Sequence, residues 1–543
     1  MKKRRKNRPM LEHRELELEE LGAILDRAKP ALSAEDHDKL KAAVDTLAFL
    51  TRELEAKDVS INRLRKLLFG PSTEKTSQVI GDDTVGTTTG QKAKKKRKGH
   101  GRNAASAYRG AEKVKVPHGS LRRGDRCPDC TKGKVYLQSD PLCLVRVKGM
   151  APLQATVYEL ENLRCNLCGN LFGANAPSGV GEGKYDETAA SMIGLLKYGC
   201  GLPFNRLERL QQGLGIPLPA ATQWDLVAAA SKLIAPAHDE LIRQAAQGDV
   251  LHNDDTTMKI LEVARQTAGE ALSSDEGPNK RTGVFTSGIV STGTGHRIAV
   301  FFTGRKHAGE NLATVLDQRA AELSQPIQMC DALSRNTVGE FKTILANCIA
   351  HARRRFADVA SGFPDECRHV LEVLGEVYRN DSVAREREMS PQKRLHWHQA
   401  ESGPVMEKLQ QWLNEQLEQH RVEPNSGLGE AIGYTLKHWS KLTLFLREPG
   451  APLDNNICER ALKKAILHRK NALFYKTENG ARVGDIFMSM IHTAELCHAD
   501  PFAYLVALQR HIDAVAQHPG EWMPWNYQDT LARLSAARDP PSS

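Results

Sequence analysis

Three carboxylate residues lie in segments that could carry them to one place. Asp254 falls in a strand-like segment, Val250–Leu261, and Asp331 ends a second one, Pro326–Asp331. Glu459 lies much further along the chain, in a helical segment. Phosphoryl transfer by two metal ions needs carboxylates that converge on a pair of Mg²⁺ ions roughly 3.5–4 Å apart, and Mg²⁺ prefers oxygen ligands. We therefore predict these three carboxylates as ligands of two Mg²⁺ ions; ordinary surface carboxylates are the alternative.

The segment that begins at Asp454 predicts a helix with Glu459 at the edge of its buried side. Asp454 is the predicted N-cap, because its side-chain oxygen can accept hydrogen bonds from the unpaired N–H groups of the first turn. Glu459 borders an apolar stripe and should be half-buried and firmly held. Asn455 and Asn456 lie beside it as supporting polar residues. The stripe at helical spacing consists of Cys458, Ala461, Leu462, Ala465 and Ile466.

Asp255, next to Asp254, competes for the role of first carboxylate. Side chains alternate between the two faces of a strand. Asp254 then shares a face with the apolar residues Met258 and Ile260, whereas Asp255 shares a face with polar neighbours. This pattern favours Asp254.

The cysteines predict a metal site rather than disulfide bonds. Eleven of them are scattered through a large chain, and an odd count of this kind argues against a disulfide framework. Four form two Cys-x-x-Cys pairs, the arrangement that binds one structural Zn²⁺ ion, and unrelated thiols are the alternative. Strand-like segments over 134–137 and 154–160 separate the two pairs. The four are Cys127, Cys130, Cys165 and Cys168.

A heptad repeat over residues 35–69 predicts a short coiled coil. Lys57 interrupts its second apolar row, and such a polar residue fixes the register of the paired helices. We expect the chain to form a homo-oligomer through this segment; an amphipathic helix packed on its own domain is the alternative. The first row consists of Leu40, Leu47, Leu54, Ile61 and Leu68.

A segment without periodicity follows, from about Gly70 to Arg102, and predicts a flexible linker that ends in a basic tract. Basic tracts that bind nucleic acid contact phosphates without reading the base sequence, although many stay solvated. The net charge of +9 also favours a polyanionic partner. The predicted DNA contacts in the tract are Lys94, Lys95, Lys96 and Arg97.

The composition is that of a soluble protein with several domains. The chain has 543 residues, of which 40% are hydrophobic and 26% charged. No apolar run approaches the ~20 residues needed to span a bilayer. The basic start over Met1–Arg8 is followed by acidic residues where a signal peptide would need an apolar segment. We therefore expect a cytoplasmic protein without a membrane partner.

The middle of the chain predicts helices and then an α/β layer. Residues 184–245 are helical in pattern, and the turn Gly215–Pro219 precedes a helix over Ala221–Leu233. This arrangement suits a helix-turn-helix that binds DNA, and equally any helical hairpin.

Strands are predicted over Arg281–Ile289 and Arg297–Thr303, followed by a helix over Ala308–Leu323. Together with the two strands that carry the aspartates, these segments make an α/β layer. Residues Arg353–Arg447 predict a long, charged helical region without strands.

Basic side chains near the predicted helices favour contact with DNA phosphates, and a solvated helix face is the alternative. Three of them are consecutive, so a helix directs them to three sides and only one or two can meet the same phosphates. The predicted contacts are Arg353, Arg354, Arg355, Lys463, Lys464, Arg469 and Lys470.

Nearly the whole chain resembles the transposases of the insertion-sequence-66 family. Two loops differ from the family pattern: Asp255–Thr257, after the first aspartate, and Ala332–Asn336, after the second. The expected zipper, the zinc module and the segment Pro501–Leu505 resemble the family's flanking modules. The stretches that carry the resemblance are Leu251–Thr256, Cys348–Phe356, Asp454–Ala461 and His468–Phe474.

The resemblance implies an RNase H-like catalytic core with a DDE triad, which falls on Asp254, Asp331 and Glu459. It implies two Mg²⁺ ions as cofactor, or Mn²⁺ in their place, and a helical insertion between the second and third acids. A Cys-x-x-His element of the family falls on Cys348 and His351. For this pair we expect support of the active site or contact with DNA, because a zinc site would need two more ligands.

The expected architecture is multidomain α+β. The RNase H-like α/β core with its helical insertion follows a coiled coil, a zinc-binding module and a helical, helix-turn-helix-like domain. The expected domains are N-terminal helices and coiled coil (1–70), basic linker (71–108), zinc-binding module (109–178), helical DNA-binding domain (179–247), catalytic domain (248–480) with an insertion over about 353–447, and C-terminal helical region (481–543).

The expected function is that of a bacterial, nucleoid-associated DNA transposase. It would bind the inverted-repeat ends of a mobile element, cut them and join them to target DNA, with accessory proteins as an open question. Two other functions would also fit the motifs. One is a zinc-containing DNA-binding regulator without catalysis, and the other is a hydrolytic nuclease that cuts DNA without joining it.

Overall fold

The computed structural model describes residues 152–164, 171–179, 183–266, 283–338 (without 294) and 343–538, with a few positions between 27 and 136. The heptad segment lies almost wholly outside the described residues, and the basic linker tract wholly so. The chain divides into two compact units, of which the larger contains Gly181–Leu207 and Pro219–Ser543. Within the described part, no helix is long and apolar enough to cross a membrane.

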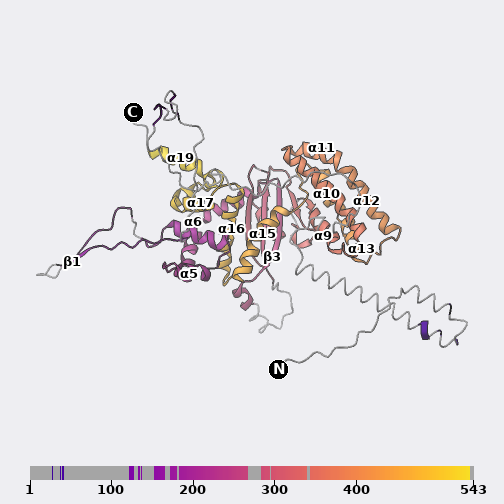
Figure 1. Cartoon of the computed structure of the whole chain (residues 1–543), viewed down its shortest axis with the longest axis horizontal. Helices are drawn as coiled ribbons and strands as arrows, with labels where there is room; N and C mark the ends of the chain where they lie inside the picture. The colour runs from indigo at the N-terminus through magenta and orange to yellow at the C-terminus, as the bar shows by residue number, and fades with distance from the viewer. Residues whose placement is uncertain are drawn as a thin grey trace. The chain divides into compact units, whose positions relative to one another are not determined.

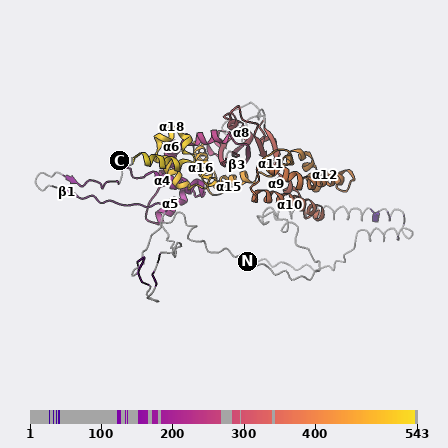
Figure 2. The same cartoon turned by 90° about the horizontal axis from the view of Figure 1, so that it is seen from above.

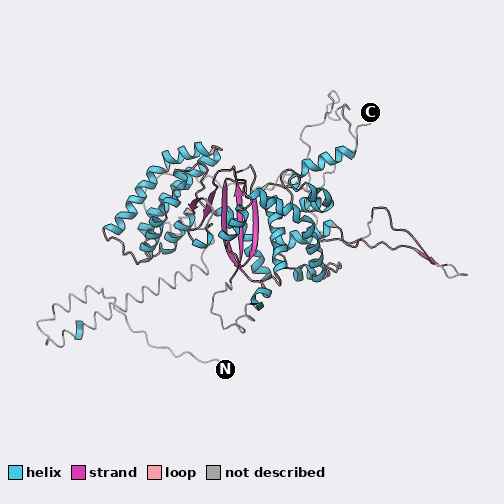
Figure 3. Cartoon of the chain, turned by 180° about the vertical axis from the view of Figure 1, so that it is seen from behind, coloured by secondary structure: helices cyan, strands magenta, loops and turns pink. Residues whose placement is uncertain are grey.

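Among the described residues, five strands form the central sheet of the larger unit: β3 (Val250–Met258), β4 (Val284–Thr292), β5 (Ile298–Gly304), β6 (Ile327–Cys330) and β7 (Ile344–Asn347). Their order is β5-β4-β3-β6-β7. Strand β4 runs antiparallel to both of its neighbours, β5 and β3, whereas β3, β6 and β7 are mutually parallel. The strands stand at the centre of Figure 3, with helices on both sides.

Helices α8 (Ala308–Leu316) and α15 (Asn456–Ala472) lie on opposite faces of this sheet. Ser287 and Gly288 are neighbours on β4, so they face opposite sides. The Ser287 hydroxyl accepts a hydrogen bond from Asn311 of α8, whereas Gly288 is packed against Leu462 of α15. Seen from above, β3 lies between the labels of these two helices (Figure 2).

Helix α16 (Glu478–Leu496) covers the edge strand β5 by means of a polar ladder. Asp485, Ser489 and Thr493 recur every four residues on one side of the helix. Their side-chain oxygens accept hydrogen bonds from the backbone N–H groups of Thr303, Phe301 and Ala299, at 2.6, 3.0 and 3.0 Å. The ladder satisfies an edge that would otherwise be open to pairing with another chain.

Helix α6 (Ala220–Ala245) packs with α16 against the sheet rather than forming a separate body (Figure 1). The expected helix ended at Leu233, three residues before Pro236. The helix continues through this proline, because its buried side outweighs one lost backbone hydrogen bond. That side consists of Val227, Ala230, Ile234, Ala237, Leu241 and Ala245.

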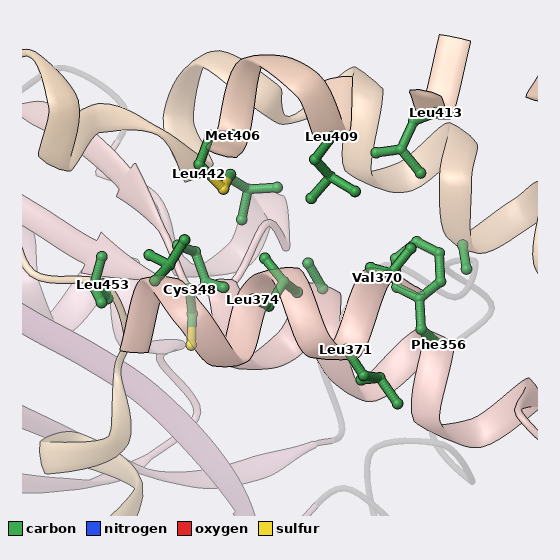
Figure 4. Packing of buried hydrophobic residues seen from close by; sticks show 14 of the residues in the cluster. Cys348, Phe356, Val370, Leu371, Leu374, Met406, Leu409, Leu413, Leu442 and Leu453 are labelled. Atoms are coloured by element: carbon green, nitrogen blue, oxygen red, sulfur yellow. The ribbon is translucent and has the colours of Figure 1, made fainter. Parts of the chain in front are cut away.

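The chain between β7 and α15 is helical, as the sequence predicts for about 353–447. Its helices are α9 (Ile349–Val359), α10 (Pro364–Glu386), α11 (Pro391–Glu401), α12 (Gly403–Glu418), α13 (Gly427–Lys437) and α14 (Trp439–Leu442). Met406, Leu409 and Leu413 point from α12 toward Val370 and Leu374 of α10 (Figure 4). This apolar core extends to Met329 and Ala346, so it joins the insertion to the sheet.

Further helices of the larger unit precede and follow these elements in the chain: α4 (Glu187–Gly194), the π-helical turn η3 (Leu195–Gly199), α17 (Pro501–Arg510), α18 (Ile512–Gln517) and α19 (Tyr527–Arg538). Helix α17 contacts α4, α6 and α16. The expected C-terminal helical region is thus part of the same compact unit as the sheet.

Two local predictions are wrong, and one strand has no counterpart among the predictions. Helix α8 ends at Leu316 instead of Leu323, because Arg319 turns back and donates to the carbonyls of Ala246 and Gly248. Strand β7 was not predicted, since its four residues precede a strongly helical segment. Residues 154–160 form no strand, and the nearest one is β1 (Asn162–Arg164).

In the smaller unit, β1 pairs antiparallel with β2 (Leu171–Gly173). Arg126 and Lys134 also pair antiparallel. The four cysteines predicted to bind zinc lie outside the described residues, but each pair falls between two paired positions: Cys127 and Cys130 between Arg126 and Lys134, and Cys165 and Cys168 between β1 and β2.

Candidate active site

Asp254 lies on the face of the sheet that α15 covers. It is directly opposite Gly288 in the antiparallel register of β3 and β4, and directly opposite residues project to the same face. A Cβ atom added to Gly288 would lie 3.0 Å from Leu462 of α15. The missing side chain therefore allows α15 to approach the strand beside Asp254.

Asp255 faces the other side of the sheet, where α8 begins. It is opposite Ser287 in the register. Its side chain is almost fully buried, 2.8 Å from Nδ1 of His307 and 3.5 Å from Nη2 of Arg335. Asp255 is thus engaged by two basic groups away from α15.

Asp331 follows β6, the parallel neighbour of β3. The register pairs His252 with Met329, so Asp254 and Asp331 each lie two residues beyond this pair. The carboxyl ends of adjacent parallel strands meet at one edge of a sheet. The two carboxylates accept hydrogen bonds from the same atom, Nδ2 of Asn336, at 3.3 and 2.6 Å.

Asn336 is itself held in place by a buried amide network. It ends the short helical turn η4 (Ser334–Asn336), and its side chain is fully buried. Its backbone carbonyl accepts from Nδ2 of Asn253 and from Nε2 of Gln328, both at 2.7 Å. Gln328 also donates to Oδ1 of Asn253. These bonds fix the loop after β6 against β3.

Glu459 lies in the first turn of α15, with 26% of its side chain exposed. This agrees with the predicted half-buried position at the border of the stripe, whose members Cys458, Ala461, Leu462 and Ala465 are buried. The thiol of Cys458 donates to the carbonyl of Gly288 at 3.2 Å. Glu459 therefore belongs to a helical turn that is hydrogen-bonded to β4 directly beside Asp254.

The predicted N-cap of this helix is wrong by one residue. Asn455 is the cap residue, and Asp454 accepts only the N–H of Asn456, at 3.0 Å. The Asn455 side chain does not cap the helix because it is used for tertiary bonds. Its Nδ2 donates to the carbonyl of Asn253, and its Oδ1 accepts from Nδ1 of His252 at 3.2 Å. Burial lowers the pKa of His252 to about 4 and keeps the imidazole neutral.

The other end of α15 is bonded to the far end of β3. Nη1 of Arg469 donates to the hydroxyls of Thr256 and Thr257 at 3.1 and 2.6 Å. Tyr475 then donates its N–H to the carbonyl of Lys259. Because both ends are bonded to one strand, α15 is a rigid support for Glu459.

Asp254 is an unusually weak acid, mainly because it is buried. Burial, together with the nearby charges of Asp331, Asp255 and Glu459, raises the pKa of Asp254 to about 7. A carboxylate of this kind is stabilised in its charged form by any cation that reaches it. The site thus combines oxygen donors with a deficit of positive charge, which suits Mg²⁺ or Mn²⁺.

The Glu459 carboxylate is turned toward basic groups of α9 rather than toward the two aspartates. Its Oε1 is 3.7 Å from Nε2 of His351, and its Oε2 is 3.8 Å from Nη2 of Arg354. Within the described part of the chain, the one group of three metal-binding residues whose ligand atoms all lie within 4.8 Å of one another is Cys348, His351 and Glu459. Glu459 would have to turn toward the aspartates to share a metal ion with them.

Some of the basic residues predicted to contact DNA bind groups of the protein itself, and others are exposed. Arg355 stacks over the ring of Tyr434 at 3.9 Å, and Lys464 pairs with Glu495 at 2.8 Å. Lys463 and Lys470 are exposed on α15. Arg353 is partly buried on α9. The four basic linker residues lie outside the described residues.

A cavity of about 340 Å³ opens beside Asp331. Its wall includes Leu333 from the loop after β6, His351 and Arg354 from α9, and Tyr434 from α13. The insertion therefore forms one wall of the space next to the carboxylates.

Sequence reasoning missed the amides that position these acids. Asn253 lies beside Asp254 in a stretch that is interpreted only for its acids, and no motif singles out Gln328 or Asn336 as a positioning residue. The one signal is Gln328 within the otherwise apolar segment Ile327–Cys330, since a buried amide needs partners.

Comparisons with known proteins show the family of the chain. A protein-family model described as "Transposase IS66 family" matches residues 182–483, more than half of the chain. The chain is 28% identical over 383 residues to the uncharacterized protein y4jD of Sinorhizobium fredii, which covers 67% of this chain and 71% of that protein. It is 27% identical over 398 residues to y4hP of the same organism, covering 69% and 68%.

Proposed function

Because the chain belongs to the IS66 family of transposases, we propose that it cuts DNA at the ends of a mobile element and joins those ends to target DNA. Asp254, Asp331 and Glu459 are the proposed triad. The observation that carries this proposal is the bridge from Asn336 to both aspartates, on the sheet face that the helix of Glu459 covers.

The order of the sheet supports an RNase H-like core. Three antiparallel strands are followed by two parallel ones, with β3 at the centre. The proposed acids come from the central strand, the end of its parallel neighbour and a helix after the insertion. The strands bring the two aspartates to one edge of the sheet, and the helix of Glu459 lies on the same face.

Two Mg²⁺ ions held by these carboxylates would activate the attacking hydroxyl and stabilise the leaving oxygen. The residues around the acids position the three carboxylates. Asn336 holds the two aspartates side by side, and α15 presents Glu459 from a fixed distance. Arg354 and His351 keep Glu459 near the site when it is not bound to metal.

In the proposed reaction, water first attacks the phosphodiester at an element end and releases a 3′-hydroxyl. That hydroxyl then attacks a target phosphodiester, forming one new P–O bond while one bond of the target strand breaks. No covalent protein–DNA intermediate is needed. The exposed Lys463 and Lys470, with Arg353 and the basic linker tract, are proposed to hold phosphates of the DNA.

Three further parts of the proposal concern flanking regions. The four cysteines would bind one structural Zn²⁺ ion, which is supported by the antiparallel pairing on both sides of each Cys-x-x-Cys pair. The helical region 179–247 would contribute to DNA binding, and the heptad segment to a homo-oligomer.

A strand-transfer assay tests the function. Purified protein, Mg²⁺, a labelled fragment with the element's inverted repeat and a plasmid target should give joined products. Cut ends without joining would instead indicate a hydrolytic nuclease, and binding without any cleavage would indicate a regulator.

A further inference from the structure

Glu459 is a member of a second group of side chains, distinct from the two aspartates. The ligand atoms of Cys348, His351 and Glu459 all lie within 4.8 Å of one another. Cys348 immediately precedes α9 and His351 lies in its first turn. Residues three apart on a helix lie on the same side, so the sulfur and the imidazole face α15 together.

Two buried atoms of this group lack a hydrogen-bond partner among the described residues. They are Oε1 of Glu459 and Nδ1 of His351. Buried polar atoms are nearly always satisfied, and an exception indicates a ligand or a strained site. The pair at 3.7 Å between Glu459 and His351 is too long for a hydrogen bond.

The sulfur of Cys348 is held in place, although burial raises the pKa of its thiol to about 12. It is fully buried, and it accepts a hydrogen bond from the backbone N–H of Asn455 at 3.2 Å. This hydrogen bond favours the charged form, but burial outweighs it, so a metal ion has to displace the thiol proton. The same N–H bond fixes the sulfur beside the start of α15, four residues before Glu459.

We propose that Cys348, His351 and Glu459 bind a thiophilic divalent ion of the Zn²⁺ class, and that this ion competes with Mg²⁺ for Glu459. One sulfur, one nitrogen and one oxygen donor are the ligands that Zn²⁺ takes in open, three-residue sites, with water in the fourth position. Mg²⁺ prefers oxygen ligands and would not use the thiol. Binding releases the thiol proton of Cys348, and the two negative ligands offset the charge of the ion.

The consequence is a switch between two metal sites that share one carboxylate. With the thiophilic ion bound, Glu459 is held on the His351 side and cannot complete the set with Asp254 and Asp331. The cavity beside Asp331, whose wall includes His351, is the path by which an ion can enter. The binding site itself stands on geometry alone, whereas the competition rests on the proposed function.

Cobalt uptake by the full chain tests the site. Protein that has been dialysed briefly against a chelator, so that it keeps only tightly bound zinc, is titrated with Co²⁺, and the thiolate-to-cobalt charge-transfer band is recorded. The wild type should take up one more equivalent than Cys348→Ser, His351→Gln or Glu459→Gln, and the band of that equivalent should be absent from Cys348→Ser. Cys367→Ser, which alters another buried cysteine of the insertion, should match the wild type. Equal uptake and equal bands in the wild type and Cys348→Ser would overturn the proposal.

Zinc inhibition tests the competition separately. Mg²⁺-dependent cleavage by the wild type should be inhibited by added Zn²⁺, and Cys348→Ser should need roughly 10–100-fold more Zn²⁺ for the same inhibition. Equal inhibition of the two proteins would overturn the competition. If the wild type binds the extra cobalt but never cleaves DNA, the proposed function fails while the metal site stands.

Discussion

The carboxylates of Asp254 and Asp331 share one hydrogen-bond donor, Nδ2 of Asn336, at 3.3 and 2.6 Å. Two like charges this close repel each other, and a shared donor reduces that repulsion. The donor cannot drift, because Asn253 and Gln328 bind the backbone carbonyl of the same residue. The two acids are thus positioned before any cation arrives.

Replacing Asn336 should therefore impair cleavage more than folding. Asn336→Ala removes the shared donor but keeps the backbone carbonyl that Asn253 and Gln328 use. We expect cleavage to fall by about 10–100-fold, since a misplacement of about 1 Å can cost that much. Ser334→Ala, an exposed residue of the same turn, is the matched control. Wild-type cleavage rates in Asn336→Ala would contradict a positioning role.

The pH dependence should follow the titration of Asp254. Its pKa is raised to about 7 by burial and neighbouring carboxylates, so the charged form that binds a cation is lost below that pH. At limiting Mg²⁺, cleavage should rise with pH through about 7. More Mg²⁺ should move the midpoint to lower pH, because a cation favours the carboxylate. A midpoint independent of Mg²⁺ concentration would count against Asp254 as a ligand.

The same shift has an opposite consequence for stability. Between its ordinary pKa near 4 and about 7, folded Asp254 binds a proton that the unfolded chain does not. The free energy of unfolding therefore decreases as pH rises through this window. Asp485 contributes with the same sign, because burial also raises its pKa to about 7. Chemical denaturation without divalent metal, at several pH values between 4 and 7, should show this decrease.

Gly309 allows α8 to approach the loop that carries Asn336. A Cβ atom at this position would lie 2.3 Å from the carbonyl oxygen of Thr337, which is too close. Gly309→Ala should cost about 1–3 kcal/mol of stability and reduce cleavage by moving the loop. Gly433→Ala is the control, because nothing lies within 4 Å there and alanine stabilises a helix interior by about 0.5–1 kcal/mol. Thermal denaturation distinguishes the two; equal melting temperatures would refute the close-packing argument.

The insertion depends on a buried charge network around Asp381. Its carboxylate lies 2.8 Å from Nη2 of Arg394, 3.2 Å from Nε of Arg385 and 3.3 Å from Nε2 of His398. Asp381→Ala leaves these groups without their anion and should cost about 3–5 kcal/mol. Glu376→Ala, an exposed carboxylate of the same helix, should change stability by less than about 0.5 kcal/mol. A melting temperature of Asp381→Ala equal to that of Glu376→Ala would show that the network is dispensable.

The elements that carry the acids could be predicted because their signals are local. The strand-like segment after Gly248 and the apolar stripe around Cys458 depend only on neighbouring residues, and both elements are present, although β3 ends at Met258 rather than at the predicted Leu261. The preference for Asp254 over Asp255 comes from the alternation of side chains along a strand, and the register places Asp254 opposite Gly288, on the face that α15 covers.

The positioning contacts could not be predicted because they join distant parts of the chain. The Asn455 side chain does not cap its helix, because it is hydrogen-bonded to His252 and Asn253, about 200 positions away. The helix of the third acid is bonded at both ends to β3, through Asn455 and Arg469, and neither residue carries a pattern that would identify its partner. The amide of Asn336 meets Asp254 only after β6 pairs with β3.

The most direct test of the triad is Mg²⁺-dependent strand transfer by Asp254→Asn and Glu459→Gln, measured beside binding of the element ends. Both changes keep the shape of the side chain and remove its charge. Strand transfer should be abolished in both variants, while end binding and the melting temperature stay close to those of the wild type. Strand transfer at the wild-type rate in either variant would contradict the assignment.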